Sequence, residues 1–273
     1  MDLSSVHRRS IEDREGFWAE QAALIDWHKP FDKVLDFTNP PFTRWFVGGE
    51  TNLCHNAIDR HLATLGDRPA LIFVSTEIGE ERILTFAELH REVMRMAAIM
   101  QAQGVGKADR VLIYMPMIPE AAIAMYACAR IGAIHSVVFG GFASHSLATR
   151  IDDATPKLIV SADAGSRAGK VVPYKPLLDE AIALAAHKPA RVLLVDRKLA
   201  PMDLVAGRAL DYATLRAAHF DAQVPVTWLE SNEISYTLYT SGTTGKPKGV
   251  QRDVGGYAVA LAASMKYIYC GNP

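Results

Sequence analysis

The stretch that decides the fold is residues 110–139, RVLIYMPMIPEAAIAMYACARIGAIHSVVF. A run of Val, Leu, Ile and Tyr at 111–114 predicts a strand, which Pro116 ends. The apolar segment 119–130 then predicts a buried helix, and the run at 134–139 predicts a second strand. A strand, a helix and another strand in this order are typical of the parallel βαβ unit.

The same alternation of helices and strands continues on both sides of this stretch. Thr85 and Glu88 form a capping box that opens a helix, and Gly104 ends it. Further elements follow in the order helix, strand, helix and strand, at 144–153, 158–160, 177–186 and 192–195. We predict an α/β fold with a doubly wound, mostly parallel sheet and helices on both faces.

Two regions outside this alternation have a different character. Residues 1–62 are rich in aromatic residues and proline and show little periodicity, so we expect an irregular extension that wraps the core. Residues 200–230 carry mixed polar sequence with one short helical stretch, which predicts a surface connection. We therefore divide the chain into an extension, 1–62, and an α/β domain, 63–273.

The composition excludes several classes of protein. Of the 273 residues, 49% are hydrophobic and 22% are charged, which is typical of a soluble globular chain with a large core. A formal net charge of -1 provides no basic field to attract nucleic acid or an anionic membrane. The N-terminus lacks the apolar run of a signal peptide, and no stretch approaches the roughly 18 uninterrupted apolar residues needed to span a bilayer.

The cysteines and histidines indicate neither a disulfide framework nor a metal site. Cys54, Cys128 and Cys270 are far apart and odd in number, which fits the reducing cytoplasm. The nine histidines lack any ligand spacing, so we expect no residue of this chain to build a metal site. We interpret His135 as a satisfied core residue, or one that supports a site from behind, and not as a catalyst.

The segment that carries the chemistry is residues 239–249, YTSGTTGKPKG, which follows a predicted strand at 234–238. Its glycines let the backbone turn N–H groups toward an anion, while its hydroxyls add donors and its lysines add charge. Pro247 stands where a Walker A loop requires Ser or Thr, so this is a phosphate loop of another kind. A solvated Gly/Thr turn is the plainer alternative, but a position just after a strand favours a ligand site.

The decamer TSGTTGKPKG, residues 240–249, resembles the signature loop of the adenylate-forming superfamily of acyl-CoA synthetases, peptide-synthetase adenylation domains and luciferases. Residues 45–61 and 131–142 resemble the N-terminal extension and a central stretch of the acetyl/propionyl-CoA synthetase branch. Within that branch, residues 163–170 and 251–258 look more like propionate-CoA ligases than acetate-CoA ligases.

The resemblance implies ATP-dependent ligation of a short-chain acid, propionate by preference, to CoA through an acyl-adenylate, with release of AMP and pyrophosphate. ATP and CoA are then co-substrates, and Mg²⁺ arrives with ATP because it binds through phosphates and few protein ligands. Lys248 would neutralise charge on the leaving pyrophosphate. The ATP phosphates would be held by Thr240, Ser241, Gly242, Thr243, Thr244, Gly245 and Lys246. CoA would be held by Gly140, Gly141, Arg167 and Lys170.

The residues proposed for CoA also have plainer interpretations. Arg167, Lys170 and Lys175 fit a solvated basic loop, and the Gly140–Gly141 pair fits a tight strand-to-helix turn. The resemblance favours a CoA site, with the 3′-phosphate at Arg167 and Lys170 and the pantetheine arm beside the two glycines.

The resemblance further implies that residues 63–273 are the first part of the AMP-binding domain of a longer enzyme. In the family, the adenine contacts, the acyl pocket, a magnesium-binding Glu and a mobile C-terminal domain come after the phosphate loop. We therefore expect a truncated chain, inactive alone and prone to self-association through an open sheet edge. The alternatives are acetate-CoA ligation, phosphotransfer with release of ADP, and a catalytically silent folded or interaction module.

Overall fold

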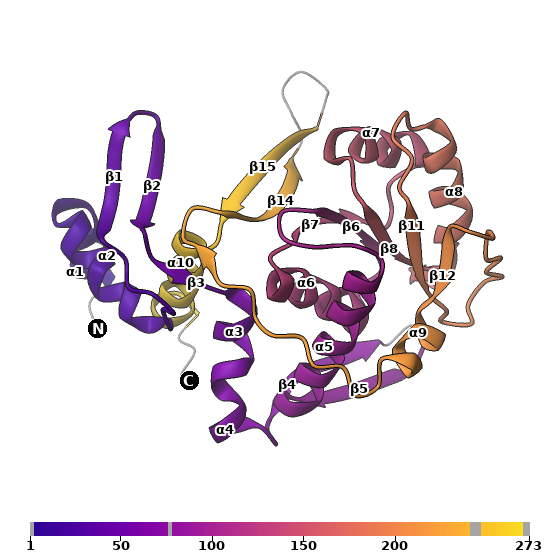
Figure 1. The fold of residues 1–273 in the computed structure, drawn as a ribbon, viewed down its shortest axis with the longest axis horizontal. Coiled ribbons are helices and arrows are strands. Elements are labelled where there is room, and N and C mark those ends of the chain that lie inside the picture. Colours follow the sequence, from indigo (N-terminus) through magenta and orange to yellow (C-terminus); the bar gives the residue numbers. More distant parts are fainter. Residues whose placement is uncertain (1–2, 76–77, 241–246, 270–273) are drawn as a thin grey trace.

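The computed structural model describes residues 3–75, 78–240 and 247–269, and its centre is a seven-stranded sheet (Figure 1). All neighbouring strands are parallel except the last pair, β14 and β15. The prediction of a mostly parallel sheet is therefore confirmed. The strand order is β12 (Ala209–Asp211), β11 (Arg191–Val195), β8 (Leu158–Ala162), β6 (Arg110–Met115), β7 (Ile134–Phe139), β14 (Ile234–Thr240) and β15 (Lys248–Asp253).

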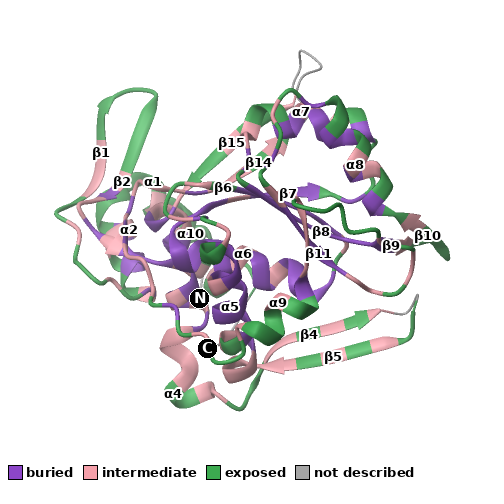
Figure 2. Ribbon diagram, turned by 45° about the vertical axis from the view of Figure 1, so that its right-hand side comes forward, coloured by how far each residue is buried: buried purple, intermediate pink, exposed green. Residues whose placement is uncertain are grey.

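Helices cover both faces of this sheet, as the doubly wound prediction requires (Figure 2). One face packs against α5 (Phe86–Ala102) and α6 (Pro119–Ile131), and the other against α7 (Ser144–Ala154) and α8 (Tyr174–Leu184). The helix α5 begins at the predicted capping box, because the Thr85 hydroxyl accepts from Glu88 N and the Glu88 carboxylate accepts from Thr85 N. Alternate residues of each central strand thus enter opposite cores.

The chain reverses its direction across the sheet at β6. From β6 it passes through α6 to β7 on one side, and then through α7 to β8 on the other side. The connections that leave β6 and β7 therefore run to opposite faces of the sheet. Open α/β sheets bind ligands outside the carboxyl ends of the strands at such a switch point, so this edge is where a site is expected.

The N-terminal region is more regular than the sequence suggested, and the prediction of an irregular extension was wrong there. Residues 3–57 form two helices, a β-hairpin and a short third helix: α1 (Leu3–Glu12), α2 (Arg14–Gln21), β1 (Lys33–Asn39), β2 (Phe42–Val47) and α3 (Leu53–Ala57). Their aromatic residues, including Trp18 and Phe46, pack against α10 (Gly255–Tyr267) in a small separate core. These elements are too short to show a sustained apolar periodicity in the sequence. They are stabilised by packing against α10, which lies about 200 positions later in the chain.

The remaining elements are short and lie around the main sheet. The predicted surface connection contains α9 (Tyr212–Ala218) and contributes β12 to the sheet edge. No helix among the described residues is long and apolar enough to cross a membrane. The other elements are the strand pairs β3 (Glu50–Thr51) with β13 (Leu229–Glu230), β4 (Pro69–Ser75) with β5 (Glu80–Thr85), and β9 (Ala164–Arg167) with β10 (Lys170–Pro173), the helix α4 (Leu62–Leu65), and 3₁₀ turns at Ala22–Leu24 and Asp59–His61.

Candidate active site

A cavity of about 840 Å³ opens at the carboxyl edge of the sheet, where β6 and β7 end. Its wall includes residues 115–118 after β6, 137–141 at the end of β7, and 165–167 of β9. Leu238 of β14 closes another side. The structure therefore brings together three of the residues predicted for CoA, Gly140, Gly141 and Arg167, around one cavity at the switch point.

Two tyrosines hold the turn that follows β7. A Cβ atom on Gly140 would lie 2.1 Å from the hydroxyl of Tyr174, and one on Gly165 would lie 2.6 Å from the same oxygen. Tyr114 donates to the carbonyl oxygen of Phe142 at 3.3 Å. Close packing against Tyr174 thus requires glycine at position 140, and the same residue lines the cavity, so the two interpretations of the glycine pair are compatible.

The described lining of the cavity carries positive charge, and the carboxylate next to it in the structure, that of Asp163, accepts from backbone N–H groups including that of Arg197. Arg167 and Arg197 both line it, and its described lining contains no Asp or Glu. Arg197 donates to the carbonyl oxygen of Ala164 at 3.1 Å, and neither guanidinium has an ion pair with a described carboxylate. Burial raises the pKa of Tyr174 in spite of the opposing charges of Arg197 and Arg167. A cavity with unpaired cations and mostly apolar walls suits a polyanion with a slender apolar arm.

The other predicted basic residues have different surroundings. Lys170 is exposed and lies opposite Arg167 in the β9–β10 hairpin, outside the described lining of the cavity. Lys175 is buried and contacts Asp179 one turn later on α8, so its place in a basic cluster was wrong. Arg197 was missed, although its place just after β11 puts it at the same carboxyl edge.

The phosphate loop joins the last two strands of the sheet. Thr240 ends β14 and Lys248 begins β15, the two residues are opposite each other in the antiparallel register, and both are exposed. Leu238 of β14 lines the cavity, so the root of the loop stands beside it. The residues predicted to hold the ATP phosphates between these two, Ser241, Gly242, Thr243, Thr244, Gly245 and Lys246, lie outside the described residues.

Comparison with known families agrees with this arrangement. The family model described as "AMP-binding enzyme" matches residues 58–272, which is most of the chain. The chain belongs to the AMP-binding enzyme family. A second model, "Acetyl-coenzyme A synthetase N-terminus", matches residues 3–57, so the regular N-terminal elements also belong to a known segment of such enzymes.

The similar proteins are acyl-CoA synthetases, which confirms the predicted family. The chain is 65% identical over 272 residues to a propionate--CoA ligase of Salmonella typhimurium and 48% identical over 263 residues to an acetyl-coenzyme A synthetase of Thiobacillus denitrificans. The solved acetoacetyl-CoA synthetase of Streptomyces lividans superimposes on 95% of the chain with a TM-score of 0.86 and 30% identity. The chain spans 43%, 40% and 39% of the lengths of these three proteins.

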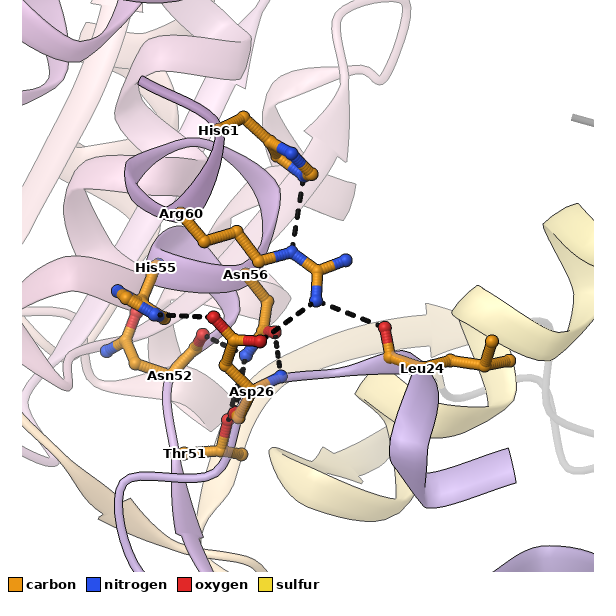
Figure 3. Close-up of polar contacts among 8 residues, drawn as sticks. All are labelled: Leu24, Asp26, Thr51, Asn52, His55, Asn56, Arg60 and His61. Carbon is orange, nitrogen blue, oxygen red and sulfur yellow. Dashed lines mark hydrogen bonds and ion pairs between the residues drawn. The ribbon is translucent and has the colours of Figure 1, made fainter. Parts of the chain in front are cut away.

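A polar junction attaches the N-terminal segment to the main body of this AMP-binding enzyme, and Figure 3 shows the part of it around Asp26 and Asn56. The buried amide of Asn52 donates to the carbonyl oxygens of Ala129 and Thr227 at 2.7 and 2.9 Å. The amide of Asn56 accepts from Asp26 N at 2.7 Å and donates to the Thr51 hydroxyl at 2.8 Å. These bonds satisfy both amides within the protein, which indicates a structural role.

The second part of this polar junction is an ion pair between Arg130 and Asp59. The buried guanidinium of Arg130 contacts both carboxylate oxygens of Asp59 at 2.9 and 3.0 Å and donates to Val224 O at 2.6 Å. Burial alone would raise the pKa of Asp59, but hydrogen bonds and charges from His90 and Arg130 lower it to about 2. The described residues contain no cluster of His, Cys, Asp or Glu that could hold a metal ion.

His135 belongs to β7, is half-buried, and stacks on the ring of Tyr236, its partner on β14. Burial lowers its pKa to about 4, so the ring is neutral at neutral pH. Its Nδ1 atom has no hydrogen-bond partner among the described residues, so the expectation of a fully satisfied core histidine was wrong in that respect. Its ring does not line the described cavity.

Proposed function

We propose that the protein carrying this chain ligates a short-chain carboxylic acid, propionate by preference, to CoA through an acyl-adenylate, with release of AMP and pyrophosphate. The single observation that carries the proposal is the cationic, glycine-flanked cavity beside the root of the phosphate loop. The printed name of the Salmonella typhimurium relative supports propionate over acetate.

ATP and CoA occupy different parts of the site. Lys248 and the loop residues 240–246 hold the β- and γ-phosphates, so that the acid carboxylate attacks the α-phosphorus in line. The CoA thiol then displaces AMP from the acyl-adenylate, with the pantetheine arm along Gly140–Gly141 and the 3′-phosphate at Arg167 and Lys170. Charge stabilisation and positioning dominate both steps.

Mg²⁺ would be held by the ATP phosphates. The described lining of the cavity contains no carboxylate, and the described residues contain no group of ligands that could bind the ion directly. The ion normally reaches such sites with the nucleotide and keeps few protein ligands. We assign no step of the reaction to a residue that binds it.

The test uses the natural gene product that carries this sequence. We expect exchange of labelled pyrophosphate into ATP that depends on propionate, and formation of propionyl-CoA with AMP when CoA is added. Acetate should be a poorer substrate. Formation of ADP would instead indicate phosphotransfer, and the absence of both activities would indicate a folded or interaction module.

Lys248 is the residue for which we expect a direct role in the adenylation step. Lys248→Ala should slow pyrophosphate exchange about 100-fold, because it removes a charge that acts on the leaving group in the transition state. The affinity for propionate should change much less. Lys266→Ala provides the control, since Lys266 lies near the end of α10, where its ammonium faces the ring of Tyr267. Equal rates in both variants would remove Lys248 from the mechanism.

A further inference from the structure

The guanidinium of Arg150 on α7 lies between two aromatic rings from distant parts of the chain. Its Cζ atom is 4.3 Å from the centroid of Phe142 and 5.6 Å from that of Tyr239. Phe142 follows the Gly140–Gly141 turn directly, and Tyr239 is the residue before Thr240 at the root of the phosphate loop. Arg150 therefore bridges the segments that we assign to the two substrates.

Burial and hydrogen bonds hold the side chain of Arg150 in this position. Its side chain is buried, and its Nη1 donates at 2.7 Å both to the carbonyl oxygen and to the hydroxyl of Ser146, one turn earlier on α7. No described carboxylate forms an ion pair with it. A buried guanidinium without a carboxylate is costly unless it faces aromatic rings, where a desolvated cation–π contact is worth about 2 kcal/mol.

Tyr239 is fixed to the same helix by a second contact. Its hydroxyl donates to Oδ2 of Asp153 at 2.5 Å. Burial and the Asp153 carboxylate both raise the pKa of Tyr239, so the hydroxyl keeps its proton and remains a donor at neutral pH. Gly249 lies opposite Tyr239 in the strand register, and a Cβ there would come within 3.4 Å of the tyrosine ring.

Backbone pairing does not fix the carboxyl end of β14 to the neighbouring strand β7. β14 and β7 are paired at one position, Tyr236 opposite His135, near the start of both strands. Their carboxyl ends, which carry the phosphate loop and the glycine turn, are thus joined through α7 side chains rather than through a continuous backbone ladder.

We propose that Arg150, held against Phe142 and Tyr239, is a positioning residue that fixes the end of β14, from which the phosphate loop starts, relative to the CoA turn. The inference rests on the proposed function. In this proposal the AMP part of the acyl-adenylate lies beside the end of β14 after pyrophosphate has left, and the thiol arrives along the turn. The thioester step therefore needs these two segments in a fixed mutual geometry. A misplacement of about 1 Å in such an arrangement can cost about 100-fold in rate.

The test compares the two half-reactions in the natural gene product. Arg150→Met keeps an unbranched, flexible stem and removes the guanidinium that contacts both rings. We expect the rate of thioester formation to fall about 10- to 100-fold, while pyrophosphate exchange falls less than about threefold and KM for CoA changes less than about threefold. Arg150→Lys, which restores the charge, should recover part of the lost rate.

Arg95→Met is the control for the loss of a buried guanidinium. Arg95 is also buried and lies 4.3 Å from the centroid of Phe220, but it pairs with the Glu92 carboxylate at 2.6 Å and lies on α5, away from both segments in sequence. This variant should lose stability and keep both half-reactions in its folded fraction. Tyr239→Phe, which removes only the hydroxyl bond to Asp153, should slow the thioester step more than the exchange.

The outcomes separate this inference from the proposed function. Equal losses in exchange and thioester formation, a raised KM for CoA alone, or unchanged kinetics in Arg150→Met would each overturn the positioning role. The absence of propionate-dependent exchange in the unmodified protein would overturn the proposed function and this inference with it.

Discussion

The polar junction around Asn52 and Arg130 and the cavity around Gly140 and Arg167 use similar residue types in opposite ways. At the junction, the Arg130 guanidinium meets both oxygens of Asp59 within 3.0 Å, and the buried Asn52 amide meets two carbonyl oxygens. At the cavity, the described lining offers two guanidiniums and no carboxylate.

The difference identifies what each region does. A charge that is paired inside the protein contributes to stability and exposes nothing to a ligand. A charge that lines a cavity without a partner contributes little to folding and is available to an anion. Substitutions at the junction should therefore change the free energy of unfolding, and substitutions at the cavity should change ligand affinity.

The largest effect should follow from breaking the junction ion pair. Arg130→Met leaves the partly buried Asp59 carboxylate beside His90 without its buried partner and removes the donor to Val224 O, so we expect a loss of about 3 kcal/mol in the free energy of unfolding. Urea denaturation measures it. Arg208→Met is the control, because its 3.4 Å pair with Asp179 is partly exposed and worth at most about 1 kcal/mol. Equal losses in the two variants would contradict the comparison.

Acid should weaken the same junction. The folded-state pKa of Asp59 is lowered from 3.8 to about 2, so its stabilisation is fully present above about pH 4 and disappears as the pH falls toward 2. The amount lost is about 2.5 kcal/mol. The gap in unfolding free energy between the native protein and Asp59→Asn should therefore narrow between pH 5 and pH 2. A gap that stays constant over this range would mean that the carboxylate is not stabilised there.

The sequence predicted the central elements because their apolar periodicity is local. The strand at 134–139 has the predicted limits, and the capping box at Thr85 and Glu88 forms as expected. The helix α8 begins at Tyr174, three positions before the prediction, where the first two N–H groups of the helix donate to Asp163 O, a residue that is distant in sequence. The N-terminal helices and hairpin could not be predicted, since their aromatic residues pack against α10 near the other end of the chain.

The residues of the candidate site that come at or just after a predicted strand with a recognisable motif could be predicted, and the others could not. Gly140, Gly141 and Arg167 follow or belong to strands whose ends meet at one edge of the molecule. Arg197 has no local motif, and its importance appears only when β11 is placed in the parallel sheet. Lys175 could have been removed from the basic cluster by its four-residue spacing from Asp179, which is typical of an ion pair within a helix.

At the cavity, Arg167 should matter for CoA and not for folding. A charge-assisted contact with the 3′-phosphate is worth about 1.5 kcal/mol at an exposed position, so Arg167→Ala should weaken CoA binding roughly tenfold. Pyrophosphate exchange and the urea midpoint should be unchanged. Calorimetric titration of the natural gene product with CoA measures the affinity. A loss of stability similar to that of Arg130→Met would place Arg167 with the junction residues instead.

Lys170 should give the smallest effect, because it is exposed and stands outside the cavity wall that Arg167 helps to form. A solvated ammonium near the 3′-phosphate is worth about 0.3–0.6 kcal/mol, so Lys170→Ala should weaken CoA binding about two- to threefold. The effect should shrink further above the ionic strength at which the Debye length falls below about 8 Å.

Dephospho-CoA lacks the phosphate that both residues are proposed to bind, so neither variant should weaken its binding. If Lys170→Ala penalised CoA as strongly as Arg167→Ala, at high salt as at low, the phosphate would lie at the hairpin tip rather than at the mouth of the cavity. If both variants penalised dephospho-CoA, the hairpin would act on the shape of the cavity and not on the 3′-phosphate.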